Sequence, residues 1–282
     1  FHLTVKEVVQ GCLCQPAPCH SCGWCHRDCA STEHLDLSFS NLSSVPSKAL
    51  RFLWKLQVLL LNGNYIAEVA ERAFSSLERL QKLDIHSNQI TVLGSSFSTG
   101  SFQHFENLQK LSFQNNIISS IEMGAFRSLT RLRQLHLQNN HLLSLHNGVF
   151  SMLQYLEVLN LGGNRIKTIA PGTPGTHILL SNNPWFCDCD LQRVFAKLHS
   201  VRWLILDDYD DMTCREPQVL RHLPLASVDT QLCIAETVTV LVITFTVFIT
   251  VVAAIVMAER NRKKRTGKHW SEDSDISYES QD

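Results

Sequence analysis

Ten cysteines are the residues of this sequence whose chemistry and spacing are most informative. They fall into two groups, which are Cys12, Cys14, Cys19, Cys22, Cys25 and Cys29 near the start of the chain, and Cys187, Cys189, Cys214 and Cys233 much later. Cysteine thiolates can pair as disulfides, bind zinc or hold iron–sulfur clusters, and both the spacing and the redox compartment decide among these.

The spacing within the first group leaves more than one chemistry open. The run from Cys19 to Cys29 follows the pattern Cys-x-x-Cys-x-x-Cys-x-x-x-Cys of bacterial iron–sulfur proteins. His20 and His26 lie within the same run and would suit a zinc site. The iron–sulfur interpretation lacks the second cysteine run and the following proline of that pattern. Disulfides are therefore the prediction for all ten cysteines, with no metal and no cofactor.

A wholly apolar segment, residues 237–258, follows the second cysteine group. Its 22 residues contain no charge, glycine or proline, and as a helix they would reach roughly 33 Å, the thickness of a hydrocarbon core. The polar atoms in it belong to threonines, which can bond back to the helix backbone. The segment is predicted to be a transmembrane helix.

The charges on the two flanks of this segment predict its orientation. Six Lys or Arg residues lie between Arg260 and Lys268, whereas residues 233–236 contain none. Because basic flanks stay in the cytoplasm, we expect a type I protein of the plasma membrane with an extracellular N-terminus. All ten cysteines then lie on the oxidising side of the membrane. The residues after Phe1 do not resemble a secretory signal, so we expect that a signal peptide has been removed or is omitted from this sequence.

The global composition excludes one class of partner. The chain carries 25 Lys and Arg against 26 Asp and Glu, a formal net charge of −1. Without a basic excess there is no electrostatic footprint for a nucleic-acid backbone, so we expect no nucleic-acid partner. With 44% hydrophobic residues the chain is too apolar to be disordered.

The chain between the two cysteine groups is an internal repeat. The pattern Leu-x-x-Leu-x-(Leu/Ile/Phe)-x-x-Asn-x-(Ile/Leu) occurs five times, starting at Leu56, Leu80, Leu108, Leu132 and Leu156. A degenerate copy from Thr32 and a shortened copy ending at Asn183 bring the total to about seven. Each copy predicts a short strand whose leucines only stacked neighbours can bury, so the strands must form a curved parallel sheet.

The asparagines of the repeat have a predicted structural role. They lie where the chain turns into the interior, and a buried amide must bond neighbouring backbone groups. The five are Asn64, Asn88, Asn116, Asn140 and Asn164. Recurring phenylalanines, Phe126 and Phe150 among them, are predicted to line the convex wall.

This pattern resembles the leucine-rich repeat family in its 24-residue extracellular form. The resemblance implies an α/β fold, a curved solenoid with a parallel β-sheet on its concave face and cysteine-rich caps at both ends. Residues 183–189, with Cys214 and Cys233, are similar to the C-terminal cap of the family, which implies the pairings Cys187 to Cys214 and Cys189 to Cys233. A family N-cap has four cysteines whereas this one has six, so its pairing stays open.

These observations divide the chain into five parts. We expect an N-terminal cap over residues 1–31, repeats over 32–183, a C-terminal cap over 184–233, a transmembrane helix over 237–258 and a cytoplasmic tail over 259–282.

Function is expected on surfaces, because no set of residues resembles a catalytic site. The chain is predicted to be no enzyme and to have no small-molecule substrate. The strand positions expected on the concave face are Asp36, Leu60, Asp84, Ser112, His136, Asn160 and Leu179, flanked by Ser38, Asn62, His86, Gln114, Gln138 and Gly162. This stripe is polar and nearly uncharged, and it lacks the aromatic and Arg anchors of tight interfaces. His34, His86, His136 and His177 map to the same face, which suggests proton sensing.

Three further features are candidate sites outside the strands. Asn41 begins the sequon Asn41-Leu42-Ser43 and is expected to be glycosylated. The acidic loop of Asp207, Asp208, Asp210 and Asp211 surrounds Tyr209, a candidate for sulfation and for contact with a basic partner. In the apolar segment Thr246, Thr250 and Ala254 form a ridge of small residues for helix packing, and Arg262, Lys263, Lys264 and Arg265 follow at the inner surface.

The arrangement of these parts leads to a hypothesis about function. It is similar to that of small single-pass leucine-rich repeat membrane proteins, among them the auxiliary gamma subunits of potassium channels and trophoblast glycoprotein. Only residues 234–236 separate the last cap cysteine from the apolar segment, which leaves no stalk. We expect a non-enzymatic protein that binds another protein in the same membrane, an ion channel being one candidate. The alternative is a cell-surface ligand-binding or adhesion receptor that acts through the repeats.

Overall fold

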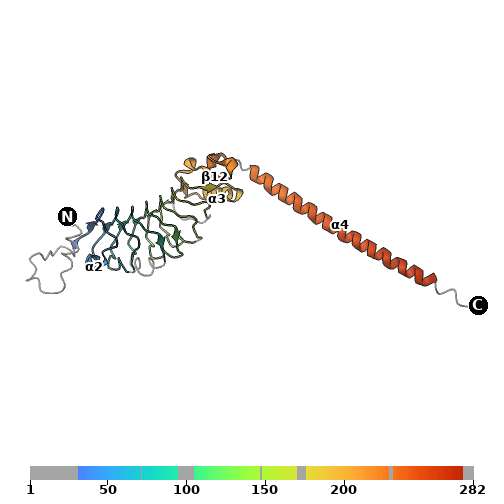
Figure 1. Cartoon of the computed structure of the whole chain (residues 1–282), viewed down its shortest axis with the longest axis horizontal. Coiled ribbons are helices and arrows are strands. Elements are labelled where there is room, and N and C mark those ends of the chain that lie inside the picture. The colour runs from blue at the N-terminus through green and yellow to red at the C-terminus, as the bar shows by residue number, and fades with distance from the viewer. Residues whose placement is uncertain are drawn as a thin grey trace, which may run out of the picture. The chain divides into compact units, whose positions relative to one another are not determined.

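The computed structural model describes residues 31–70, 72–94, 105–146, 148–169, 176–228 and 231–275. The chain divides into two compact units, one up to Val228 and one from Asp229 onwards, and each is described by itself. In the first unit the repeats follow one another as similar turns (Figure 1). The second unit is a long helix.

The first unit is built on a parallel sheet of eight strands. In sheet order these are β1 (His34–Asp36), β2 (Val58–Leu60), β3 (Lys82–Asp84), β5 (Lys110–Ser112), β7 (Gln134–His136), β8 (Val158–Asn160), β9 (His177–Leu179) and β11 (Ile205–Leu206). Seven come from the predicted copies of the repeat, which confirms the solenoid. The eighth, β11, belongs to the C-terminal cap and was not predicted.

The leucines of each strand point into the solenoid as the pattern predicts. The central residue of each repeat strand is buried, as is the apolar residue two positions later, Leu135 and Leu137 being one such pair. Across the core Phe126 and Phe150 are also buried, with their rings stacked 5.9 Å apart. Among the described residues, the convex side contains turns, the short helix α2 (Ser47–Leu50) and a pair of parallel strands, β4 (Val92–Leu93) and β6 (Ser120–Ile121). Leucine and phenylalanine together therefore fill the space between the two walls.

The repeat asparagines form a continuous ladder of buried hydrogen bonds. The side-chain amide of Asn140 donates to the carbonyls of Phe113 and Leu137, both at 3.0 Å, and its oxygen accepts from the Ile118 N–H at 3.0 Å. Asn116 also donates to Phe113, and Asn164 also donates to Leu137. Between Leu61 and Leu161 each such carbonyl is thus shared by two asparagines, so every turn is joined to the next. The predicted structural role of these residues is confirmed.

The residue just before each ladder asparagine, or its counterpart in the first and last copies, has a left-handed backbone. The seven residues are Phe39, Gly63, Ser87, Asn115, Asn139, Gly163 and Asn182, with φ between 52° and 67°. This conformation costs a non-glycine residue roughly 1–2 kcal/mol, and Asn tolerates it best. At Gly163 a side chain would meet a second obstacle, because a Cβ there would lie 2.2 Å from Oδ1 of Asn139 and would force that side chain to move.

The C-terminal cap closes the apolar end of the stack. It contains β10 (Trp185–Phe186), α3 (Cys189–Ser200), η3 (Tyr209–Asp211), β12 (Cys214–Glu216), η4 (Gln218–Leu220) and η5 (Leu225–Ser227). The Asp188 side chain accepts from the Leu191 N–H at 2.8 Å and caps α3. Phe195 of α3 meets the buried Trp185 edge to face, with ring centroids 5.6 Å apart. The helix therefore covers the end of the core.

A disulfide joins Cys187 and Cys214 across this cap, as the resemblance implies. Cys189 is also in a disulfide. The side chain of its predicted partner, Cys233, and the six cysteines from Cys12 to Cys29 lie outside the described residues, so those predictions stay open.

The second unit is the helix α4 (Gln231–Asp275). Residues Val238–Lys263 are long and apolar enough to cross a membrane, and they are not buried against other parts of the protein. The hydroxyls of Thr246 and Thr250 donate to the carbonyls of Ile243 and Val247, each at 2.8 Å. These bonds satisfy the polar atoms within the helix, as a hydrocarbon environment requires.

Candidate functional site

The concave face carries three columns of side chains rather than the two expected. Side chains two positions apart in a strand share a face, so the residue before each central buried residue also points to the concave side. These residues form the first column, and the strand register places them beside one another across the sheet. This column runs His34, Val58, Lys82, Lys110, Gln134, Val158, His177 and Ile205. The stripe was predicted to be nearly uncharged because Lys82 and Lys110 had not been assigned to it. In these two copies only the downstream neighbours Asp84 and Ser112 were expected on the concave face.

A charged cluster occupies the centre of this face. The carboxylate of Asp84 lies 2.6 Å from Nδ1 of His86 and is next to Ser112 in the register. Lys82 and Lys110 are neighbours in the first column. Burial lowers the pKa of His136 below its ordinary value; Asp84 opposes this and Lys110 adds to it. His136 is therefore held in its neutral form at neutral pH.

The four predicted concave histidines are not brought together. His86 contacts Asp84 on β3 and its turn, whereas His177 contacts Asp207, with 3.0 Å between Nδ1 and Oδ1. His34 lies on β1 and His136 on β7, with β2, β3 and β5 between these strands in the sheet. A shared proton-sensing cluster is thus not formed, and each imidazole has its own surroundings.

Glutamines form a further part of the central surface. Gln138, which was expected beside the concave stripe, is half-buried and its amide donates to the Gln114 side chain. Its own side-chain oxygen is buried without a hydrogen-bond partner in the described chain. The stacking of equivalent positions in adjacent copies produces this burial.

The C-terminal end of the concave face supplies the aromatic anchor that the strands lack. Strand β11 pairs with β9, so that Ile205 lies beside His177. Ile205 is 48% exposed and Trp203, in the turn leading to β11, is 72% exposed. The sequence did contain a signal for this strand. Leu204 and Leu206 alternate with Trp203 and Ile205 at the period of a strand and pack against the core.

One aspartate of the acidic loop has a structural role, whereas the other three are exposed at the surface. The Asp208 carboxylate accepts from the N–H groups of Leu180 and Ser181 at 2.8 and 2.7 Å, which closes the end of the sheet. The Tyr209 ring packs on His199, with ring centroids 4.4 Å apart, and burial together with Asp210 raises the pKa of its phenol. Asp207, Asp210 and Asp211 remain exposed, whereas Tyr209 is half-buried.

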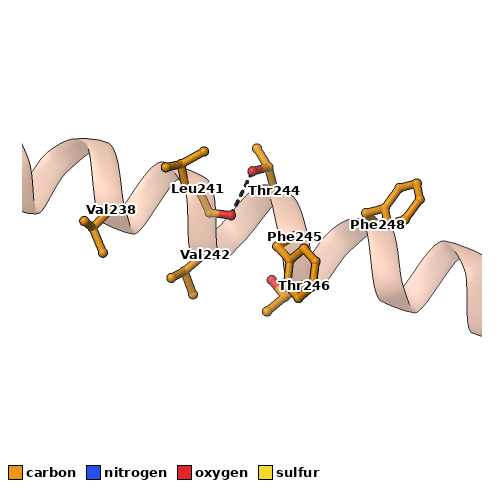
Figure 2. A pocket seen from close by; sticks show the side chains of 7 residues that line it. All are labelled: Val238, Leu241, Val242, Thr244, Phe245, Thr246 and Phe248. Carbon is orange, nitrogen blue, oxygen red and sulfur yellow. Dashed lines mark hydrogen bonds between the residues drawn. The ribbon is translucent and has the colours of Figure 1, made fainter.

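The small-residue ridge lies on α4, whose apolar side chains are exposed along the described span. Figure 2 shows the seven residues that line an open apolar recess on one stretch of this helix, including Leu241, Phe245 and Phe248. The Thr244 hydroxyl points back to the Leu241 carbonyl, at 2.9 Å (Figure 2). Such a surface suits lipid or another helix.

No cluster of metal ligands occurs among the residues that the structure describes. The candidate zinc residues His20 and His26, with their cysteines, lie outside the described residues. The side chains of Lys264 and Arg265 also lie outside the described part. Asn41 is exposed in the first turn of the solenoid.

Known proteins with similar sequences also contain leucine-rich repeats. A family model described as leucine rich repeat matches residues 30–90, 95–142 and 130–173. Leucine-rich repeat and fibronectin type III domain-containing protein 1 is 38% identical over 64 residues in Rattus norvegicus, Mus musculus and Homo sapiens. That match covers 23% of this chain and only 8% of each relative.

Among solved structures, the crystal structure of human 5T4 (Wnt-activated inhibitory factor 1, trophoblast glycoprotein) superposes with a TM-score of 0.55. The two chains are 25% identical, and the similarity covers 72% of this chain and 87% of the other. The structural similarity therefore extends over most of both chains and is not limited to a few repeats.

Proposed function

The chain belongs to the leucine-rich repeat family, and from this premise we propose that it is a non-enzymatic, single-pass protein of the plasma membrane that binds another protein of the same membrane. The solenoid is extracellular and the basic end of α4 is cytoplasmic. The charges between Arg260 and Lys268 support this orientation, as does the disulfide between Cys187 and Cys214.

One observation carries the proposal of protein binding. The C-terminal cap presents Trp203 and Ile205 to solvent at the end of the sheet. Exposing two large apolar side chains is unfavourable in water, and buried Trp residues dominate the energy of many protein interfaces. Asp207, Asp210 and Asp211 of the following loop are exposed. This surface fits a protein with an apolar pocket bordered by Lys or Arg.

The sequence favours a partner in the same membrane. Only residues 234–236 separate Cys233 from Thr237. A protein that reaches across a gap between cells gains from a spacer, whereas one that binds a neighbour does not need it. The ridge of Thr246, Thr250 and Ala254 supplies a second contact, because small residues let two helix backbones approach closely. An ion channel is the partner class that the resemblance to gamma subunits implies.

Co-purification of the full-length chain from detergent extracts tests this proposal. Trp203→Ala should weaken binding by about 30-fold, since truncating an anchor of this kind costs about 2 kcal/mol. Tyr155→Ala is the matched control, because Tyr155 is an aromatic residue that is 63% exposed but lies on an earlier repeat. Equal retention of the partner by both variants would exclude the cap as the binding surface.

A second set of variants tests the contribution of the transmembrane helix to binding separately from that of the C-terminal cap. Replacing Thr246, Thr250 and Ala254 together with Leu should reduce association while surface expression is unchanged, because larger side chains hold the helices apart. Neutralising Arg262, Lys263, Lys264 and Arg265 should alter function more than binding, provided that topology is checked in the same cells. Current recordings with and without the chain test a channel partner.

The charged centre of the concave face supports the alternative function of a ligand-binding or adhesion receptor. Lys82 and Lys110 lie together there beside Asp84 and His86. A receptor acting through this face would lose its ligand on Lys110→Glu and keep it on Trp203→Ala. If a soluble fragment ending at Cys233 reproduced full activity, the receptor would replace the same-membrane partner as the conclusion.

A further inference from the structure

Phe39 is an unusual residue for its position in the first turn of the solenoid. Its backbone lies in the left-handed region with φ of 52°, where the later copies have Gly, Ser or Asn. A bulky residue is strained in this conformation. Burial does not offset that strain, because Phe39 is 79% exposed. The side chain is therefore held at the surface at a cost in stability.

Gly63 in the next turn accommodates the Phe39 ring. A Cβ on Gly63 would lie 2.3 Å from Cε1 of Phe39, so only glycine lets the ring approach the backbone this closely. The Phe39 N–H donates to the carbonyl of Asn62 at 3.0 Å. Ring and backbone are thus both placed by the second copy of the repeat, and most of the ring surface remains open to solvent.

Asn41 follows in the same turn, and the backbone on both sides of it is fixed. The N–H groups of Ser40 and Leu42 both donate to Oδ1 of the buried Asn64, each at 3.0 Å. The Leu42 carbonyl accepts from the Tyr65 N–H at 2.8 Å. Asn41 itself has φ of 59° and an exposed side chain. Within the described chain, neither its amide nor the Ser43 hydroxyl has a hydrogen-bond partner.

We propose that Asn41 carries an N-linked glycan and that the first sugar of this glycan stacks on the ring of Phe39. The C–H bonds on one face of N-acetylglucosamine are weakly positive, and the face of an aromatic ring is negative, so the two surfaces attract and exclude water. The sequon supplies the acceptor, and Phe39, two residues earlier, supplies the platform. The interaction explains why an exposed Phe occupies a strained position.

The attachment is the ordinary transfer from a lipid pyrophosphate-linked oligosaccharide. The Asn41 amide nitrogen forms a bond to the anomeric carbon, the bond from that carbon to the pyrophosphate oxygen breaks, and the amide loses one proton. This step needs a luminal solenoid, so the inference rests on the proposed orientation of the chain.

Site occupancy is tested on the full-length chain expressed in animal cells. Peptide-N-glycosidase should lower the mass of the wild-type chain and leave Asn41→Gln unchanged. Gln109→Thr in an Asn41→Gln background is the control, because it creates a second sequon at Asn107, which is also exposed. Glycosylation at Asn107 without glycosylation at Asn41 would overturn this inference alone. Absence of glycan from both would overturn the proposed orientation with it.

Thermal unfolding then tests the stacking. We compare the intact glycoprotein, the protein trimmed by an endoglycosidase to one sugar, and the protein with no sugar. The first two should unfold at the same temperature, and the third about 2 to 4 °C lower. Enzymatic removal also converts Asn41 to Asp, so the Ser43→Ala variant, which keeps Asn41 but destroys the sequon, serves as the sugar-free reference.

The decisive variant is Phe39→Gly, which suits the left-handed backbone and so keeps the turn intact. In this variant all three forms should unfold at one temperature, whereas Phe39→Tyr should retain the difference. A difference that persists in Phe39→Gly would overturn the stacking. So would loss of a co-purified protein partner on Phe39→Gly with the sugar-dependent shift unchanged, since Phe39 would then be a protein-binding residue.

Discussion

Replacing Asn140 by Leu tests the asparagine ladder, because Leu has nearly the shape of Asn and none of its hydrogen bonds. The Ile118 N–H is buried and loses its partner completely, which costs about 1–3 kcal/mol. The carbonyls of Phe113 and Leu137 each lose one of two donors, at about 1 kcal/mol apiece. The variant should therefore lose about 3–5 kcal/mol of the free energy of unfolding.

The neighbouring residue provides the control. Asn139 is exposed and its side-chain amide donates to the Asn115 side chain, a surface contact, and Asn139→Gly keeps both the left-handed backbone and the N–H that donates to the Gly162 carbonyl. Surface changes of this kind stay within about 0.5 kcal/mol.

Urea denaturation of the purified full-length chains, followed by tryptophan fluorescence, measures both differences because Trp185 is buried in the cap. The loss predicted for Asn140→Leu is a large share of the roughly 5–15 kcal/mol typical of a folded domain. If the two variants unfolded at the same urea concentration with equal slopes, the ladder would contribute nothing and the argument from shared carbonyls would fail.

Three further predictions concern single positions in the repeats. Leu135→Asp should abolish surface expression because it places a carboxylate in the core, whereas Leu143→Asp, at a leucine that is 61% exposed, should not; flow cytometry compares them. Burial lowers the pKa of His136, so the folded protein favours the neutral imidazole and loses stability when the pH falls below about 6.5. The free energy of unfolding of the wild type should therefore fall more steeply below that pH than that of His136→Gln, and equal pH profiles of this free energy would refute the prediction. Gly163→Ala should destabilise more than Gly124→Ala, because both have positive φ but only at Gly163 would the new Cβ clash, with Oδ1 of Asn139 at 2.2 Å, whereas at Gly124 it would lie 4.0 Å from Cδ of Arg127; equal midpoints in urea would show that backbone strain alone matters.

The sequence by itself determined the features that repeat. A leucine that recurs in every copy must face the interior, because no copy can bury it alone, and the recurring Asn140 and its equivalents must bond backbone there. The apolar segment after Thr237 was assigned to a helix from its length and composition alone. Each of these inferences uses a local pattern whose physical meaning does not depend on the neighbouring residues.

The candidate binding surface was decided by tertiary structure. Lys82 and Lys110 lie side by side only because the sheet register pairs residues 28 positions apart. Trp203 and Ile205 reach the end of the concave face because β11 joins β9, and the cap lacks the leucine-rich repeat spacing from which this pairing could be predicted. Tyr209 is half-buried because α3 brings His199 against its ring. Lateral neighbours across a solenoid come from different copies and different caps, so their contacts, burial and pKa shifts exist only once the chain has stacked.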